Sequence, residues 1–309
     1  DEADRMLDMG FQQALDDIIS YMPKQRQTLL FSATYPPKIQ HTANRIMQSP
    51  VMVEVQDSHS NQSIVQNLYE VENDDGRIEA VRLLLQAHQP ESTLIFCNTK
   101  IETDQVANEL RGVGYEALAL HGDLEQKQRD QTLVRFSNRS ASILVATDVA
   151  ARGLDIEALD LVINYQIARE LEVHTHRIGR TGRAGAQGIA CTLHTQKENH
   201  KIGLLEDYLK QKLERDNLPP LALLRQPAFV APMITLQIGG GKKQKVRAGD
   251  IVGALTGDEG MPASEIGKIQ VGDQWAYVAV TQAHGKTAFN RLSEGKIKGR
   301  SFKIRRLRG

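Results

Sequence analysis

Apolar positions between residues 63 and 211 alternate between two spacings. Short continuous apolar runs are separated by stretches in which apolar residues recur every three or four positions. The runs predict strands at Leu94–Cys97, Ala117–Leu120, Ile143–Thr147, Leu161–Tyr165 and Ile189–Leu193. The stretches predict helices at Arg77–Ala87, Glu102–Gly112, Gln126–Phe136 and His200–Gln211. Strands that alternate with helices imply a parallel sheet with right-handed crossovers, and ligands then lie at the carboxyl ends of the strands.

A shorter α/β segment precedes this domain. Helical spacing is seen at Leu7, Phe11, Leu15, Ile18 and Ile19, and a second helix is predicted from Ile39 to Met47. Strands are predicted at Gln27–Phe31 and Val51–Val55. Buried parallel strands need helices on both faces, so these pieces alone make a poor core. We therefore expect residues 1–56 to be the C-terminal part of a first domain, followed by a polar linker at 56–62.

The remainder of the chain predicts a separate unit. Four prolines between residues 217 and 232 are typical of a stiff connector, so 217–231 is predicted as a linker and 63–216 as the domain before it. Strands are predicted at Ile234–Ile238, Ile266–Val271, Trp275–Val280 and Ser301–Ile304. Helices are predicted at Ala248–Leu255 and Lys286–Glu294. The order βαββαβ over 232–309 is that of a ferredoxin-like fold.

Composition excludes several classes of protein. The chain has 309 residues, of which 40% are hydrophobic and 25% charged, so it is not a wholly disordered protein. No apolar run approaches the roughly 18 residues of a membrane span, and the first residues lack a signal-peptide pattern. Cys97 and Cys191 are too few for a disulfide scaffold or a cysteine-rich zinc site. We expect a cytoplasmic protein with no membrane partner.

A net charge of zero conceals an asymmetry along the chain. Residues 233–309 contain 14 Lys and Arg against 6 Asp and Glu, while the whole chain contains 38 of each. The last 77 residues are therefore basic and the rest is acidic. A basic domain is typical of a nucleic-acid partner, because Lys and Arg neutralise phosphates. A solvated tail is the alternative, and the folded pattern of this part disfavours it.

Two short motifs lie in the first segment. Asp1-Glu2-Ala3-Asp4 offers paired carboxylates, one able to hold Mg²⁺ through water and the next able to deprotonate a water. In isolation, a surface acidic cluster explains these residues better. Ser32-Ala33-Thr34 follows an apolar run, and its hydroxyls could bond to the carboxylate of Asp4 or cap the next helix.

The most specific motif is His176-Arg177-Ile-Gly-Arg180-Thr-Gly-Arg183. Arginines spaced by three, with small residues between, present guanidinium groups that suit bidentate phosphate binding. Upstream, the predicted strand Ile143–Thr147 ends in polar residues and a glycine turn. Thr147 could donate to a phosphate, and Asp155 could accept from a ribose hydroxyl. Arg129 follows another strand end, where a surface charge on a helix is the default explanation.

Taken together, these segments resemble motifs of the DEAD-box RNA helicases in order and spacing. The matching segments are Asp1–Asp4, Ser32–Thr34, Leu94–Lys100, Gln126–Arg129, Ala146–Ile156 and His176–Arg183. The resemblance implies part of a RecA-like domain, then a complete RecA-like parallel-sheet domain, within an α/β fold. It also implies an ATP-dependent RNA helicase that uses ATP and Mg²⁺.

The resemblance assigns a role to each matching residue. Asp1 would act on Mg²⁺ and Glu2 on the hydrolytic water, whereas Arg180 and Arg183 would reach the γ-phosphate and Asp155 the ribose. The residues expected to couple ATP binding to domain closure are Asp4, Ser32, Thr34 and His176. The residues expected to contact the RNA backbone are Thr99, Arg129 and Thr147.

The C-terminal unit resembles the RNA-binding domain of the DbpA subfamily, which has an RRM-like fold. The resemblance implies a protein that acts on a hairpin of large-subunit ribosomal RNA during 50S assembly, and we expect it to be a monomer. The usual pair of stacking aromatics is absent, and Trp275 and Tyr277 are expected to be core or partial stacking residues. The expected RNA contacts are basic side chains: Lys242, Lys243, Lys245, Arg247, Lys303, Arg305, Arg306 and Arg308.

Two elements of the family, the adenine-reading Gln segment and the Gly-rich Walker A loop, are expected before Asp1 and are missing from the 309 residues. No Gly-x-x-x-x-Gly-Lys-Ser/Thr sequence, which forms the phosphate-binding Walker A loop, occurs in them. We expect an N-terminal part to be absent and this polypeptide to hydrolyse ATP negligibly by itself. The alternatives are a non-catalytic RNA-binding fragment and a DNA helicase. Competition between RNA and DNA of the same sequence separates the last from the others.

Overall fold

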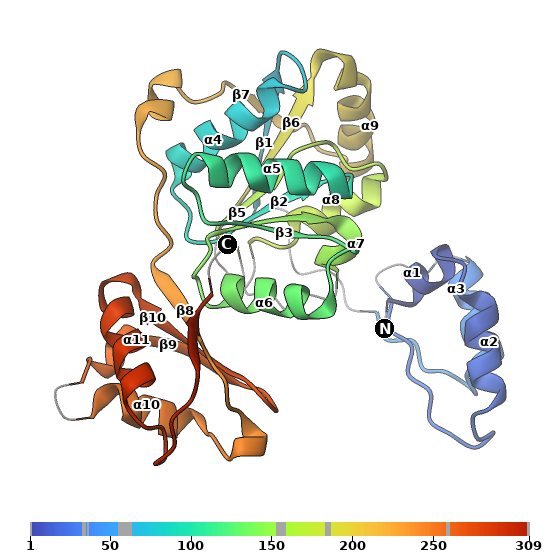
Figure 1. The fold of residues 1–309 in the computed structure, drawn as a ribbon. Coiled ribbons are helices and arrows are strands. Elements are labelled where there is room, and N and C mark those ends of the chain that lie inside the picture. Colours follow the sequence, from blue (N-terminus) through green and yellow to red (C-terminus); the bar gives the residue numbers. More distant parts are fainter. Residues whose placement is uncertain are drawn as a thin grey trace. The chain divides into compact units, whose positions relative to one another are not determined.

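In a computed structural model, the chain divides into two compact units, residues 1–58 and 59–309. The structure describes residues 2–32, 35, 37–54, 64–152, 159–182, 187–257 and 260–307. Most helices and strands of both units are labelled in Figure 1. The predicted linker at 56–62 lies outside the described residues.

The regular elements of the first unit, over the residues that the structure describes, are helices. Its helices are α1 (Ala3–Asp8), α2 (Gln12–Ser20) and α3 (Pro37–Ile46). The helix predicted from Ile39 to Met47 is confirmed as α3. The strands predicted at Gln27–Phe31 and Val51–Val55 were wrong for every described residue of those runs. A strand requires a neighbour to pair with its backbone, and side chains such as Val51, at 87% exposed, are not buried here.

The second unit begins with a parallel sheet of seven strands in the order β3-β4-β2-β5-β6-β1-β7. Its strands are β1 (Ile64–Val71), β2 (Thr93–Cys97), β3 (Ala117–Leu120), β4 (Ile143–Thr147), β5 (Leu161–Asn164), β6 (Gly188–Thr195) and β7 (Glu214–Asp216). Its helices are α4 (Gly76–His88), α5 (Lys100–Gly112), α6 (Gln126–Ser137), α7 (Asp148–Ala151), α8 (Leu171–Ile178) and α9 (Asn199–Leu209). The predicted α/β architecture is confirmed, although β1, β7, α7 and α8 were not anticipated.

Helices cover both faces of this sheet. Side chains at alternate positions of β2 show the division: Ile95 packs with α4 and α5, whereas Phe96 packs with α6, α7 and α8. All five residues of β2 are buried. Burial on both faces explains why the strands appear in the sequence as continuous apolar runs.

The C-terminal part of the second unit contains a four-stranded antiparallel sheet in the order β11-β8-β10-β9. Its elements are β8 (Met233–Ile238), α10 (Ala248–Thr256), β9 (Ile266–Val271), β10 (Ala276–Thr281), α11 (Gly285–Glu294) and β11 (Ile304–Arg306). The βαββαβ order is confirmed. The last strand begins at Ile304 rather than at Ser301, and β10 begins after Trp275.

The connector between the two sheets packs against the parallel-sheet domain. The Gln86 side chain on α4 donates to the carbonyl oxygen of Pro227 at 3.0 Å. The rings of Tyr115 and Phe229 meet edge to face, with centroids 5.2 Å apart. The proline-rich connector is therefore ordered and packed against the surface of this domain.

The outer face of the antiparallel sheet also contacts the parallel-sheet domain. Thr235 on β8 is fully buried, and its hydroxyl lies 2.7 Å from Ser140 Oγ and accepts from Asn138 Nδ2 at 3.2 Å. Lys268 on β9 donates to Ser137 Oγ at 2.7 Å. These bonds come from the residues at and just beyond the C-terminus of α6. Part of the sheet face is thereby occupied by protein.

No helix that the structure describes is both long enough and apolar enough to cross a bilayer.

Candidate functional site

The acidic segment and the Ser32 segment of the first unit lie against each other. Ser32 Oγ accepts a hydrogen bond from the backbone N–H of Asp4 at 3.1 Å, and the backbone N–H of Ala3 donates to the carbonyl of Phe31 at 3.1 Å. The predicted partner of the hydroxyl was the Asp4 carboxylate, whereas the bond observed is to the amide. Glu2 is exposed and has a positive φ of 50°. Asp1 and Thr34 lie outside the described residues.

Arg177 organises the carboxyl ends of the strands in the second unit. Its side chain, on α8, is only 1% exposed, and its Nε and Nη2 donate to the two oxygens of Asp148 at 2.6 and 2.8 Å. Nη2 also donates to Asn98 Oδ1 at 2.8 Å, and Nη1 donates to the carbonyl of Gln166 at 2.8 Å. The guanidinium carbon lies 5.2 Å from the centroid of the Phe96 ring. One side chain thus ties the ends of β2, β4 and β5 to α8.

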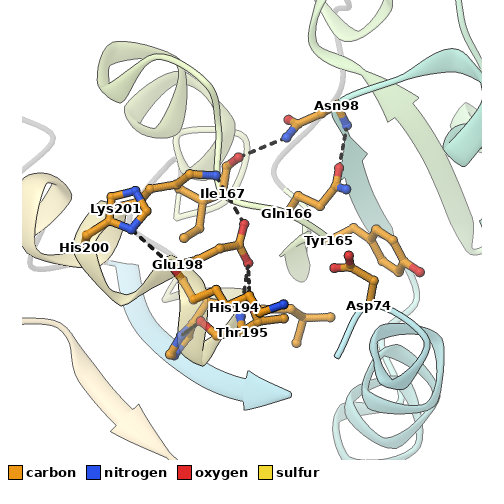
Figure 2. A network of polar contacts seen from close by, with 12 residues as sticks. Asp74, Asn98, Tyr165, Gln166, Ile167, His194, Thr195, Glu198, His200 and Lys201 are labelled. Atoms are coloured by element: carbon orange, nitrogen blue, oxygen red, sulfur yellow. Dashed lines mark hydrogen bonds and ion pairs between the residues drawn. The ribbon is translucent and has the colours of Figure 1, made fainter. Parts of the chain in front are cut away.

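Figure 2 shows further bonds at the same edge of the sheet. Asn98 lies directly after β2 and also donates two hydrogen bonds. Its backbone N–H donates to Gln166 Oε1 at 3.3 Å, and its Nδ2 donates to the carbonyl of Ile167 at 3.1 Å. The sequence analysis grouped Arg177 with the arginines suited to phosphate binding, whereas its guanidinium is buried and bonded to Asp148 and Asn98. It gave Asn98 and Asp148 no individual role. The available signal was that polar residues follow apolar strands whose carboxyl ends meet at one edge.

A second buried arginine joins other strand ends. Arg77 on α4 is also 1% exposed and donates to Asp74 Oδ1 at 2.8 Å and Glu198 Oε2 at 2.5 Å. It donates to the carbonyls of Tyr165 and Leu193 at 2.8 and 3.0 Å. Glu198 in turn accepts from the backbone N–H of Thr195, as drawn in Figure 2. These bonds give Arg77 a structural role, joining α4 to the ends of β5 and β6.

A small hollow that is partly open to solvent lies beside Arg177. The residues that give it chemical character are Phe96, Asp148, Arg152, His176, Arg177 and Arg180. Arg152, His176 and Arg180 line the hollow together with the ion pair between Asp148 and Arg177. A small hollow of this kind suits an anionic group. The predicted residues His176 and Arg180 are brought together here, whereas Arg183 and Asp155 lie outside the described residues.

The three predicted RNA-contact residues of this domain occupy different positions. Thr99 caps α5: its hydroxyl accepts from the Glu102 N–H at 3.2 Å and donates to Glu102 Oε2 at 2.7 Å. Arg129 Nη2 donates to the carbonyl of Ala150 on α7 at 3.0 Å. Thr147 is half-buried at the end of β4. Their backbone-contact role stays a prediction.

Burial perturbs two titratable groups near Arg177. His174, on α8, is 1% exposed; burial and then the charge of Arg177 lower its pKa to about 4. The imidazole is therefore neutral at pH 7. Burial likewise raises the pKa of the Cys97 thiol, which is unpaired and 0% exposed. Neither group is a candidate acid, base or nucleophile at neutral pH. Among the described residues, no group of His, Cys, Asp and Glu could hold a metal ion.

In the C-terminal domain, the glycines and lysines after β8 have separate roles. A side chain on Gly240 would overlap the ring of Phe302, and one on Gly241 would overlap the carbonyl oxygen of Gly272. The glycines are thus required by packing within the protein. Lys242, Lys243 and Lys245 follow them and are exposed, as is Arg247.

Two further cations join this loop, and sequence reasoning did not single them out. Lys298 Nζ donates to the carbonyl of Lys245 at 3.4 Å, and Arg300 Nη1 donates to that of Gln244 at 3.5 Å. Both come from the tight turn that follows Ile297. Arg305 and Arg306 lie on β11 and are exposed, and Arg308 lies outside the described residues. The loop cations form one basic surface with the turn.

Comparison with family models defines the class of protein. The model of the DEAD/DEAH box helicase matches residues 1–42, and that of the helicase conserved C-terminal domain matches residues 76–185. The second model contains Arg177, Asp148 and the hollow beside them. The model of the DbpA RNA binding domain matches residues 235–306, which include the basic loop.

Whole-chain comparison narrows the class. The ATP-dependent RNA helicase DbpA of Escherichia coli is 48% identical over 308 residues, covering 100% of this chain and 67% of that protein. Its namesake from Bacillus subtilis is 34% identical, covering 98% of this chain and 68% of that protein. The chain belongs to the DbpA-like DEAD-box RNA helicases, a family of enzymes that hydrolyse ATP.

A solved structure supports the fold. The structure titled S. cerevisiae Dbp5 bound to RNA and ADP BeF3 superposes with a TM-score of 0.60 and 31% identity. It covers 71% of this chain, which spans 58% of that one.

Proposed function

We propose that this chain supplies the phosphate-contacting arginines and the RNA-targeting domain of an ATP-dependent helicase that acts on large-subunit ribosomal RNA. The arrangement at Arg177 carries the proposal. Its buried bonds to Asp148 and Asn98 hold α8 against the sheet, so that His176 and Arg180 line the hollow beside them. Preorganised cations of this kind stabilise charge on a transferred phosphoryl group.

The donor set fits a nucleotide phosphate. Bound ATP with Mg²⁺ would supply the phosphoanhydride bond whose hydrolysis drives the cycle. Arg180 and Arg183 would bind the γ-phosphate oxygens, and Asp155 would accept from the ribose. Asp1 would hold Mg²⁺ through water, Glu2 would take a proton from the attacking water, and Asp4, Ser32, Thr34 and His176 would couple these events to domain closure. The Dbp5 structure bound to RNA and ADP BeF3 shows that a relative takes a nucleotide and RNA together.

RNA binding is proposed for both domains of the second unit. Thr99, Arg129 and Thr147 would contact the backbone in the helicase domain. Lys242, Lys243, Lys245, Arg247, Arg305 and Arg306 would bind phosphates in the C-terminal domain. The proposed target is a hairpin of ribosomal RNA in particles that precede the 50S subunit. The proposed setting is a monomer in the reducing cytoplasm, which the unpaired, buried Cys97 and Cys191 support.

The test of the enzymatic part uses two forms of the protein. The 309-residue chain alone should show negligible RNA-stimulated ATP hydrolysis, because its sequence contains no Walker A loop. The same chain joined to an N-terminal segment with a Walker A loop should show turnover. If the joined protein also fails to hydrolyse ATP, the alternative function, RNA binding without catalysis, is favoured.

Arg180→Ala tests the role of the hollow in the joined protein. Turnover should fall by about 10³-fold, whereas RNA affinity should change little, since the proposed partner is the nucleotide. Arg180→Lys should recover only part of the rate, because an ammonium lacks the bidentate fork. Arg215→Ala, an exposed arginine on β7, is the matched control and should leave turnover unchanged. Equal losses of turnover and RNA affinity in Arg180→Ala would identify Arg180 as an RNA contact instead.

A further inference from the structure

Trp275 is the only tryptophan of the chain, and its side chain is 42% exposed. It lies in the turn between β9 and β10, directly before Ala276 and two residues before Tyr277. The next residues of the strand face the core, since Ala276 and Val278 are fully buried. Of the two roles expected for Trp275, core or partial stacking, the core position is therefore excluded. A large aromatic surface is left in contact with solvent.

The turn that bears Trp275 is bonded to the basic loop. The backbone N–H of Lys242 donates to the carbonyl of Gly272 at 2.8 Å, and that of Lys243 donates to the carbonyl of Asp273 at 2.9 Å. Gly272 N–H donates to the Trp275 carbonyl at 2.8 Å. Gly241 lies so close to the turn that a Cβ would overlap Gly272. The loop and the turn therefore form one rigid unit.

The charge around this unit favours an anionic ligand. Lys242, Lys243 and Lys245 are exposed on the loop, and Asp273 is the exposed acid of the turn. The second acid near the loop, Asp250, accepts from the Arg247 N–H at 2.9 Å. Exposed ammonium groups thus outnumber exposed carboxylates. Basic side chains beside an exposed aromatic are the combination with which proteins bind single-stranded nucleic acid.

The usual place for base stacking in this fold is partly closed. The sheet face at Thr235 is buried against Asn138 and Ser140. Thr235 pairs with Ala279 on the neighbouring strand β10. Tyr277, on the same strand as Ala279, is half-buried. Trp275 lies at the end of this strand in the turn, beside the lysines. An unpaired base that stacks on the indole there leaves the contacts of Thr235 with Asn138 and Ser140 in place.

We propose that Trp275 stacks on an unpaired base of the RNA whose phosphates the Lys242–Lys245 loop binds. This inference rests on the proposed RNA-binding function of the loop. The lysines bind the backbone on either side of the base, and the indole, held by the bonded turn, provides a flat surface that loses little entropy on binding. The ligand class is RNA with at least one unpaired nucleotide, such as a hairpin loop or a bulge.

Because Trp275 is the only tryptophan, its fluorescence reports this contact directly. The 309-residue chain is titrated with a hairpin RNA that has an unpaired loop and with a fully paired duplex of equal phosphate number. The hairpin should quench the emission in a saturable manner, and the duplex should quench it much less. Equal quenching by the two RNAs, or none by either, would overturn the inference.

Substitution provides an independent readout. Trp275→Leu should weaken binding of the hairpin by about 5- to 150-fold, whereas Trp275→Phe, the matched control, should retain most of the affinity. The salt dependence should stay unchanged in Trp275→Leu, because no phosphate contact is lost. Circular dichroism confirms that both variants are folded. If Trp275→Leu and Trp275→Phe bind as the unsubstituted chain does, stacking is excluded.

A further variant distinguishes failure of the Trp275 stacking proposal from failure of the proposed RNA-binding function of the loop. Lys243→Ala with Lys245→Ala should lower affinity and reduce the slope of log affinity against log salt by roughly 2. If this double variant is unaffected, the proposed RNA site on the loop is wrong. If it is weakened while the Trp275 variants and the fluorescence are unaffected, only the stacking proposal fails.

Discussion

Replacing Arg177 by methionine should destabilise the second unit and abolish ATP turnover in the protein joined to a Walker A segment. Methionine keeps much of the apolar volume but removes the donors that serve Asp148, Asn98 and the Gln166 carbonyl. Removing one partner of a buried ion pair costs about 3–5 kcal/mol. The Asp148 side chain is 24% exposed and can be partly rehydrated, so we expect the lower end, about 3 kcal/mol.

Urea unfolding measures this cost. With a typical slope of about 2 kcal/mol per molar urea, the midpoint should fall by about 1.5 M. Far-UV circular dichroism reports unfolding of the whole chain, while Trp275 fluorescence reports unfolding of the C-terminal domain. The two midpoints should differ if the C-terminal domain stays folded to a higher urea concentration. Asp148→Asn in the Arg177→Met background should recover part of the loss, because it removes the uncompensated charge.

Arg77→Met is the matched control. Arg77 is equally buried and similarly bonded, to Asp74 and Glu198, but does not line the hollow. Its loss should cost a similar free energy of unfolding. In the protein joined to a Walker A segment, and at a temperature where both variants are folded, Arg77→Met should retain turnover and Arg177→Met should not. The reasoning is refuted if Arg177→Met unfolds at the wild-type midpoint, or if both variants lose turnover equally.

Two other predictions concern stability. His174 has a pKa of about 4 when folded and about 6.5 when unfolded, so the unfolded state binds more protons between these values. Stability should therefore fall by about 2 kcal/mol from pH 7 to pH 5, and His174→Gln should flatten this dependence in urea titrations; an unaltered profile would show that His174 is not its source. Gly241→Ala should cost about 1–3 kcal/mol because its Cβ overlaps Gly272, as measured by Trp275 fluorescence in urea. Gly253→Ala, at an exposed position of α10 with no atom near its Cβ, should instead stabilise by about 0.5–1 kcal/mol, and equal effects of the two substitutions would contradict the packing argument.

Apolar spacing was sufficient to predict most elements of the second unit. The strands Ala117–Leu120, Ile143–Thr147 and Ile266–Val271 have the predicted boundaries. Burial of both faces of a parallel sheet produces a continuous apolar run, which is a strong local signal. The order of motifs was sufficient for the family. The same spacing failed at Gln27–Phe31, because strand formation depends on a pairing partner that a local pattern does not specify.

The roles of individual side chains depended on contacts between residues distant in sequence. Thr99 is a helix cap whose partner Glu102 is local, and the cap could have been predicted from the sequence. Arg177 could not be distinguished from its neighbours Arg180 and Arg183, because its burial is decided by Asn98 and Asp148 on other strands.

The sequence by itself determined the fold class, the βαββαβ order and the family, since these follow from local periodicity and from residues whose order along the chain is diagnostic. Only the tertiary structure decided that Gly241 is needed for packing and that Trp275 is exposed beside the lysines. Both depend on the Gly272–Trp275 turn, which is about 30 residues away in sequence and is brought to the loop by pairing of β8 with β10.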